Sequence, residues 1–523
     1  MGKNSIDRGS RDSWTITPKM VEAAKAALAD APKAGKGKKG GKGGAGGVAE
    51  FNRLFRDTSQ RDPRGYILPA SQPDFLTATK FVNALMATGV KVHRAKADFE
   101  VAGKKYPAGS YVVKCAQAFR PYVLDLFEPQ NYPNDFAYPG APPTPPYDSA
   151  GWTLAYQMAV QFDRILDGFD GPFEEIKGAL SPTPGQVTAA QGAAGFFLDT
   201  RLNDSFHAVN RLLKAGLEVR RLQEPFEAQG EKYPAGTFFI PNKARTPRLL
   251  ERIASELGTP FRGSLIAPGK EAVTVKPVRV GLWDRYGGSM PSGWTRWLME
   301  RFEFPFQVVF APDLDKGGLR EKFDVLIFVD GAIAGGGGKK GGGFGGAMPD
   351  EESLPEEYRG RRGEVTQEKT VPKLREFLEG GGTILTIGTS TGLGKQLGLP
   401  LANHLVATDN EGNEKPLPRE KYYVPGSVLR VRVDPAHPLA WGLSGQADVM
   451  FSNSPTFRLL EGAGGSGLKR VAWFDTKTPL RSGWAWGQEY LEGGVAVAEA
   501  RVGKGRLVLF GPQILFRAQP HGT

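Results

Sequence analysis

The hydrophobic pattern of the chain contains an internal repeat. The run KYPAG occurs at residues 105–109 and again at 232–236, an offset of 127 residues. In each copy an apolar stretch is followed by a helical spacing of apolar residues, a second apolar stretch, the YPAG turn and a third apolar stretch. The expected strands are 66–68, 90–93 and 111–113 in the first copy and 196–198, 217–220 and 238–240 in the second, with helices through 81–85 and 209–213. Gly89 and Gly216 fall where a helix C-cap needs a positive φ. We therefore predict two α/β units that pack as a pseudo-symmetric pair.

Two segments outside the repeat have other patterns. Residues 129–147, between the copies, are rich in proline and aromatic residues, which predicts an extended strap across the domain surface. A helix is expected to follow at 152–166. Residues 13–60 predict a helical hairpin that is interrupted by a Gly/Lys tract.

From residue 276 the pattern alternates between strands and helices. Strands are expected at 278–283, 306–310, 325–329 and 383–387, and helices at 294–302 and 371–378. From about residue 422 the sequence is richer in β signal and closes with a strand at 506–510. The alternation indicates a doubly wound parallel sheet, as in flavodoxin-like or glutamine-amidotransferase-like domains. The predicted fold class is therefore α/β, with a helical segment at 1–60, a duplicated unit at 61–270 (repeats at about 65–128 and 195–262) and a doubly wound domain at 276–523.

The net charge and the cysteine count exclude several classes of function. The net charge is +11, but seven of the excess lysines lie in two Gly/Lys runs without acids, near 33–47 and 334–347. The positive and negative charges of the remaining residues nearly cancel, so we expect no nucleic-acid partner. Cys115 is the single cysteine, which excludes an intramolecular disulfide and a multi-cysteine zinc site. The first twelve residues show no signal-peptide pattern, and no apolar stretch is long enough to span a membrane.

The histidines do not form a metal-binding pattern. There are five, and none belongs to an H-x-x-E, H-E-x-x-H or H-x-H pair. We therefore predict no metal site and no cofactor in this chain.

A possible nucleophile stands at Ser390. Residues 388–392, GTSTG, match G-x-S-x-G and follow a predicted strand, the context of a nucleophile elbow. A serine nucleophile needs a histidine base, for which His404, His437 and His521 are the downstream candidates, with Asp434 as a third member. In amidotransferase-like domains the same turn holds a cysteine and an H-x-E pair follows, and this sequence has neither. We predict that Ser390 is a turn residue, with a serine hydrolase as the alternative.

Two aromatic groups are candidate ligand-binding sites. Trp283, Asp284, Arg285 and Tyr286 come at the carboxyl end of the first strand of the doubly wound domain, where open α/β sheets bind ligands. Asp284 and Arg285 would orient a small polar ligand there, or else pair with each other or cap the next helix. The faces of Trp484, Trp486 and Tyr490 suit sugars or peptides, or else pack in a core or an interface.

Several long segments resemble one protein family. They are FRPYVLDLFEPQNYPND, WDRYGGSMPSGWTRWLMERFEFPF, YYVPGSVLRV, RSGWAWGQEYL and GKGRLVLFGPQILFRAQPHGT. They are similar to the region downstream of the peptidase domain in long bacterial zinc carboxypeptidases of the carboxypeptidase A type. The resemblance implies that the zinc ligands and the glutamate base lie upstream, in a part that this chain lacks, and that both ends are truncated. It also implies export of the parent protein.

The expected function is therefore that of a non-catalytic accessory region. Its expected partner is the upstream peptidase domain of the parent, which would hold the zinc and remove C-terminal residues from peptides. The alternatives from other classes are the serine hydrolase using Ser390 and a glycan- or peptide-binding module.

Overall fold

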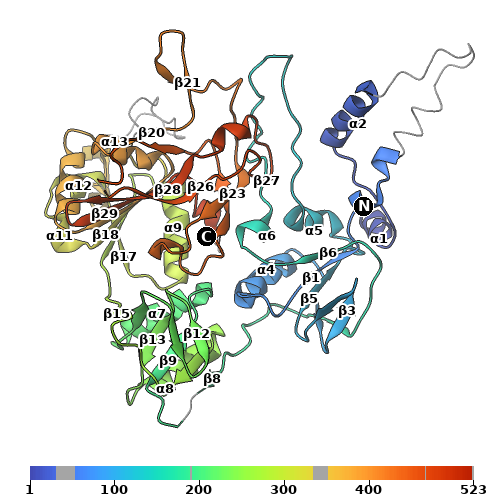
Figure 1. The fold of residues 1–523 in the computed structure, drawn as a ribbon, viewed down its shortest axis with the longest axis horizontal. Coiled ribbons are helices and arrows are strands. Elements are labelled where there is room, and N and C mark those ends of the chain that lie inside the picture. Colours follow the sequence, from blue (N-terminus) through green and yellow to red (C-terminus); the bar gives the residue numbers. More distant parts are fainter. Residues whose placement is uncertain (31–52, 189–190, 334–350, 466, 521–523) are drawn as a thin grey trace, which may run out of the picture.

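The computed structural model describes residues 1–30, 53–188, 191–333, 351–465 and 467–520 (Figure 1). They form a short helical N-terminal segment and three α/β units. Both Gly/Lys runs lie almost wholly outside the described residues. In the N-terminal segment, α1 spans Gly2–Gly9 and α2 spans Pro18–Asp30. Helix α2 falls within the predicted hairpin, and α1 lies in the predicted helical segment 1–60 but before the hairpin.

The first unit is a five-stranded antiparallel sheet with helices packed on it. Its elements are β1 (Gly65–Leu68), α4 (Phe75–Ala87), β2 (His93–Ala95), β3 (Phe99–Val101), β4 (Lys104–Tyr106), β5 (Tyr111–Lys114), α5 (Arg120–Phe127), α6 (Leu154–Gln157), β6 (Asp163–Ile165) and β7 (Phe173–Glu175). The strand order is β6-β1-β5-β2-β7, with β3 and β4 as a separate hairpin. Asp74 caps α4 by accepting a hydrogen bond from the Thr77 amide.

The second unit has the same strand order. Its elements are β8 (Val187–Thr188), β9 (Gly195–Leu198), α7 (Asn203–Lys214), β10 (Arg220–Leu222), β11 (Phe226–Ala228), β12 (Glu231–Tyr233), β13 (Phe238–Pro241), α8 (Thr246–Leu257), β14 (Phe261–Ser264) and β15 (Ala272–Thr274). The order β14-β9-β13-β10-β15 corresponds strand for strand to that of the first unit. The register also agrees, because His93 pairs with Val112 and Arg220 pairs with Phe239, 127 residues on in both strands.

Two sequence predictions in this region were wrong. The second strand of each copy begins three residues later than expected, at His93 and Arg220, because the preceding apolar residues fill the core before the ladder starts. The helix predicted at 152–166 is only the short α6. The chain reverses after it, where Ala159 has a positive φ of 51°, and then pairs as β6 with β1. The apolar residues of 158–165 thus pack as a turn and a strand rather than as one helix face.

The third unit is built on a twelve-stranded mixed sheet. Its first elements are β16 (Val280–Trp283), α9 (Met290–Arg301), β17 (Phe306–Val309), α10 (Ala311–Asp315), α11 (Leu319–Lys322), β18 (Val325–Phe328), α12 (Thr370–Glu379), β19 (Thr383–Ile387) and α13 (Leu393–Gln396). The later strands are β20 (Leu401–Asn403), β21 (Val406–Thr408), β22 (Glu414–Pro416), β23 (Ser427–Val433), β24 (Gln446–Phe451), β25 (Phe457–Leu459), β26 (Lys469–Trp473), β27 (Leu480–Ser482), β28 (Val495–Val502) and β29 (Gly505–Phe510).

Five of the twelve strands of this sheet have the predicted parallel pattern. Strands β17-β16-β18-β19-β29 are parallel and follow the 2-1-3-4-5 order of doubly wound sheets. The sheet then continues through the antiparallel strands β28, β26, β23 and β24. The prediction of a fully parallel sheet is therefore corrected to a mixed one.

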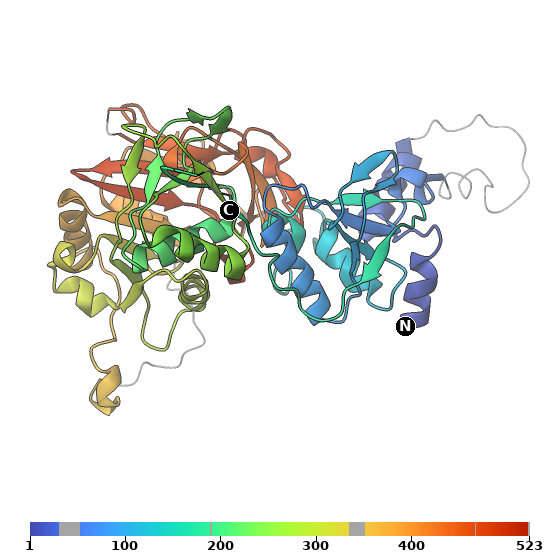
Figure 2. The ribbon, with the colours of Figure 1, turned by 90° about the horizontal axis from the view of Figure 1, so that it is seen from below.

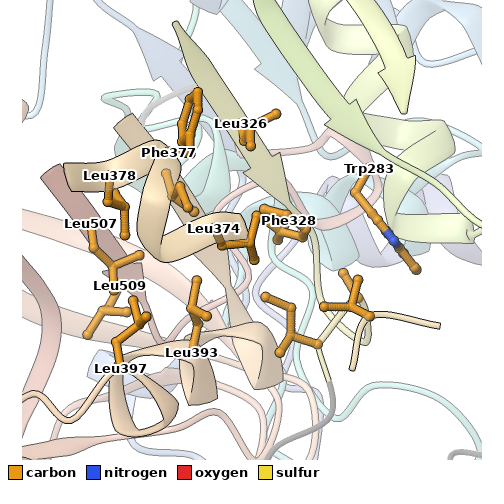
Figure 3. Packing of buried hydrophobic residues seen from close by; sticks show 14 of the residues in the cluster. Trp283, Leu326, Phe328, Leu374, Phe377, Leu378, Leu393, Leu397, Leu507 and Leu509 are labelled. Atoms are coloured by element: carbon orange, nitrogen blue, oxygen red, sulfur yellow. The ribbon is translucent and has the colours of Figure 1, made fainter. Parts of the chain in front are cut away.

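The core of the third unit lies between the parallel strands and their helices. In Figure 3, Leu374, Phe377 and Leu378 of α12 face side chains of β18 and β29. Phe328 and Leu374 are fully buried. Burial of this apolar face, at roughly 25 cal/mol per Å², holds the helix against the sheet and so fixes the strand ends that carry the candidate site.

The proline-rich segment crosses from the first unit to the third. Asn131 forms a β-bridge with Gly483, and the Trp484 indole stacks on Tyr132 with 5.5 Å between ring centroids. The Trp484 Nε1 donates to the Asn134 side chain at 3.0 Å. We call residues 129–150 the strap. Figure 2 shows the first unit beside the third, the two units that the strap joins.

Candidate functional site

A cavity of about 460 Å³ opens at the carboxyl ends of the first parallel strands of the third unit. Its walls come from the loops after β16 and β17 and from the connection after β18. The lining residues are Asp284, Arg285, Tyr286, Gly287, Gly288, Arg296, Val308, Phe310, Tyr358 and Arg361. This edge of a doubly wound sheet is where such folds bind ligands, and the volume is that of a small-molecule site.

Asp284 is the buried acid of the cavity. Its amide donates to the Val309 carbonyl at 3.0 Å, which fixes the loop to β17. One carboxylate oxygen accepts from the Arg285 amide at 2.8 Å, and the other lies 4.0 Å from the Arg296 guanidinium. Burial raises the pKa of Asp284, against the hydrogen bonds that it accepts. The sequence left open whether Asp284 pairs with Arg285, and the structure shows a bond only to the Arg285 backbone.

Arginines and aromatic rings form the other walls. Arg285 donates from Nε to the Gly288 carbonyl at 3.0 Å, which leaves its terminal nitrogens at the exposed rim. The Arg361 guanidinium lies over the Phe310 and Tyr358 rings, at 5.4 and 4.8 Å from their centroids. Such cation–π stacking holds the guanidinium plane in place without consuming its hydrogen-bond donors.

Three of the four ligand-binding candidates named from the sequence line this cavity. Asp284, Arg285 and Tyr286 do so, whereas Trp283 points into the core (Figure 3). Trp283 is 4% exposed, and its indole N–H has no hydrogen-bond partner in the described part of the chain. The reason is the alternation of a strand, since the last residue of β16 and the residue after it face opposite ways.

Five lining residues were missed by the sequence interpretation. Val308 lies in β17, Arg296 comes from the second turn of α9, and Phe310, Tyr358 and Arg361 come from connections. A scan for basic residues on α9 would have found Arg296. Tyr358 and Arg361 reach the site only through the fold of a long connection, and no local pattern marks them.

Ser390 is a buried structural residue of the turn after β19. Its hydroxyl donates to the Val329 carbonyl at 2.6 Å and accepts from the Ile333 amide at 3.0 Å. The side chain is fully buried. Both bonds tie the β19 turn to the loop after β18, and the bond to the Val329 carbonyl occupies the proton that a base would have to take.

The histidines proposed as bases for Ser390 have other partners. His404 Nε2 lies 3.1 Å from the Glu492 carbonyl, and burial lowers its pKa. His437 Nδ1 accepts from the Leu439 amide at 3.3 Å. His521 lies outside the described residues. The geometry of the described residues therefore gives Ser390 no catalytic partner.

The tryptophan group at 484–490 is used for packing. Trp484 is 3% exposed beneath the strap, and Phe136 packs edge-on against Trp486 at 4.9 Å. The Trp486 Nε1 donates to the Glu420 carbonyl at 2.8 Å. Tyr490 stays exposed at 41%. Of the two uses considered for these rings, the structure shows an interface.

Metal ligands and membrane spans were searched for across the described residues. Nowhere in these residues do three His, Cys, Asp or Glu side chains gather as a metal-binding group. No helix in the described ranges is long and apolar enough to cross a membrane.

The comparisons with known proteins find structural likeness only. No family model and no curated protein matches the chain. A β-galactosidase from Rahnella sp. R3 is 12% identical and aligns over 52% of this chain and 34% of its own, with a TM-score of 0.26. A glutamine amidotransferase from Thermotoga maritima is 13% identical over 46% of this chain and 76% of its own (TM-score 0.25). A putative ThuA-like protein from Bacteroides uniformis is 9% identical over 49% and 92% (TM-score 0.26). The chain spans about a third of the β-galactosidases that it matches.

Proposed function

We propose that this chain is a non-catalytic accessory region of a zinc-metallocarboxypeptidase-like protein. In this proposal the third unit is an amidotransferase-like domain without a nucleophile. The upstream peptidase domain of the parent is its partner and holds the zinc. The units of this chain position a peptide or glycan substrate for that domain.

The observation that carries the proposal is the state of the turn after β19. In a catalytic domain of this type the turn presents a nucleophile to solvent. Here the Ser390 hydroxyl is buried and bonded to Val329 and Ile333 on both its donor and acceptor sides. Exposing it would break two buried hydrogen bonds, each worth about 1 kcal/mol. It would also leave a buried amide without a hydrogen-bond acceptor. This supports a structural role for the turn, as an accessory domain would have.

The family resemblance supplies the second support. Segments similar to the region after a peptidase domain occur from the end of the first repeat to the final residues of the chain. Activity in the parent would then follow the upstream part, and residues 1–523 would affect substrate affinity or stability.

The test is co-expression of this chain with the upstream peptidase domain that the proposal requires. We expect the chain to change KM for peptides or the thermal stability of the partner, with kcat nearly unchanged. A fluorophosphonate probe should leave the chain unlabelled. Labelling that disappears in Ser390→Ala, with Ser452→Ala as the matched serine control, would instead establish the hydrolase alternative.

A further inference from the structure

The cavity beside β16 has an excess of positive charge. It holds three guanidinium groups, from Arg285, Arg296 and Arg361, and a single carboxylate, Asp284. Arginine stays protonated at any working pH. Within the described residues, Arg285 and Arg361 have no acidic partner at ion-pair distance, and the nearest carboxylate oxygen to Arg296 is 4.0 Å away. These cations therefore remain able to bind an anion.

The same cavity has an aromatic side. Phe310 and Tyr358 lie against Arg361, and Tyr286 and Val308 complete the apolar part of the lining. A planar ring entering here would contact aromatic edges and faces while its charged group lay near the guanidiniums. Aromatic contacts of this kind stabilise a bound ring beyond the effect of the area that they bury.

The loop after β16 leaves open space on its cavity side. Gly287 and Gly288 both have φ near +80°, and a Cβ built on either would have no atom within 4 Å. The left-handed conformation favours glycine at both positions. Because neither residue has a side chain, the entrance to the cavity stays wide. With a volume of about 460 Å³, the cavity admits a ligand the size of a substituted benzene ring or larger.

We propose that this cavity binds a small organic anion that carries an aromatic ring, an aryl phosphate or aryl carboxylate. The guanidiniums of Arg285, Arg296 and Arg361 bind the anionic group, because their planar forks match two oxygens at once. The ring lies against Phe310 and Tyr358. Asp284, held on the Arg285 amide, orients Arg296 from behind. A cationic ligand is disfavoured by the net positive lining. This inference concerns the cavity alone and does not depend on the proposed parent protein.

The experiment is isothermal titration of the full chain with four probes. Phenyl phosphate and benzoate carry both the ring and the charge, inorganic phosphate carries only the charge, and benzyl alcohol carries only the ring. We expect saturable binding of phenyl phosphate or benzoate, at least about tenfold tighter than inorganic phosphate or benzyl alcohol. Which of the two binds more tightly identifies the anionic group as phosphate or carboxylate.

Variants assign the binding to this cavity. Arg361→Gln should weaken the binding of the ring-bearing anion by about tenfold or more, because it removes a charged hydrogen-bond donor to the anionic group. Tyr358→Ala should weaken the binding of phenyl phosphate more than that of inorganic phosphate, because it removes the ring contact as well as one of the two rings that hold Arg361. Arg301→Gln is the matched control, since Arg301 is on α9 but stacks on Trp297 outside the cavity. The proposal is overturned if no probe binds, if benzyl alcohol binds as tightly as the anions, or if Arg361→Gln and Arg301→Gln behave alike in a folded protein.

Discussion

The first and second units have the same arrangement of strands and helices, which we call the frame. They are attached to the third unit by different elements. Both frames have the same strand order and the same register, and both place the YPAG glycine in a left-handed turn, with φ of 88° at Gly109 and 91° at Gly236. The repeated residues therefore specify the frame. The first unit is attached through an insertion that the second unit lacks, whereas the second unit is attached largely through residues that both copies share.

The first unit is attached through an insertion. Between β5 and β6 it carries the strap, which pairs with Gly483 and covers Trp484. Thr153, just after the strap, donates to the Ser482 hydroxyl at 2.9 Å, in a group that also includes Gln130. The second unit has only α8 at the corresponding place between β13 and β14. The second unit therefore has no insertion that corresponds to the strap.

The second unit is attached through its own repeat turn and helix. A Cβ on Gly236 would lie 2.6 Å from the Trp441 Cβ, and Arg221 stacks on the Trp441 indole at 4.8 Å. Helix α7 adds an ion pair from Arg211 to Glu303 at 2.9 Å. One turn sequence thus makes a free loop in the first copy and a domain contact in the second. A repeat in sequence thus predicts a repeated frame, but it does not predict which of the shared residues contact another unit.

The largest expected effect is the loss of the strap contact in Trp484→Ala. The substitution removes a 3% exposed indole, its stack on Tyr132 and its bond to Asn134, which should cost about 3–5 kcal/mol of stability. Because the strap is held locally, chymotrypsin should cleave the variant at Tyr132 or Phe136 at least about a hundredfold faster than the parent.

The control for this experiment is Tyr490→Ala in the same loop region. Tyr490 is 41% exposed, so its removal should change stability by less than about 1 kcal/mol and leave strap cleavage unchanged. Tyr138 and Tyr147, which are exposed in the native strap, serve as internal reference sites. Equal strap cleavage in both variants would show that Trp484 does not hold the strap.

A smaller effect is expected from the matched pair Gly236→Ala and Gly109→Ala. Both substitutions place a side chain on a left-handed residue, which costs about 1–2 kcal/mol. Only Gly236→Ala also meets a neighbour at 2.6 Å, whereas the nearest atom to a Cβ on Gly109 is 3.7 Å away. Overpacking should add about 1–3 kcal/mol to Gly236→Ala. Thermal unfolding of the two variants measures the difference, and equal losses would contradict the proposed attachment.

Much of the frame could be predicted from the sequence, since its signals are local. Glycines at helix ends and in the YPAG turns have the positive φ expected of them, 99° at Gly89 and 74° at Gly216. The alternation of strands and helices after residue 276 also predicted the parallel half of the large sheet. The antiparallel half was missed because its long-range pairing, such as β23 with β24 and β26, leaves no periodic signal that differs from that of a parallel strand.

The candidate site could be predicted only where it lies at a strand end. Asp284 and Arg285 follow β16 directly, so a rule about carboxyl ends finds them. Arg361 and Tyr358 come from a connection whose path is decided by tertiary packing. Ser390 shows the opposite case, in which the local motif was present and its surroundings, the Val329 carbonyl and the Ile333 amide, decide that it is structural. A motif of this kind indicates catalysis only when the surrounding contacts in the fold leave its side chain free to react.

The smallest expected effect compares one corresponding position in the two frames. Cys115 follows β5 and donates its amide to the Arg64 carbonyl at 2.9 Å, and Asn242 follows β13 and donates to the Ala194 carbonyl at 2.9 Å. The Asn242 side chain then bonds to Ala193, whereas the Cys115 thiol is fully buried and burial raises its pKa to about 12. Because the thiolate is the reactive form, at pH 8 only about one thiol in ten thousand would be ionised. A disulfide reagent should therefore modify Cys115 at least about a hundredfold more slowly in the native protein than in guanidinium chloride, with glutathione as the reference thiol. Rapid labelling of the native chain would mean that the first frame opens at β5 and is not packed as tightly as the second.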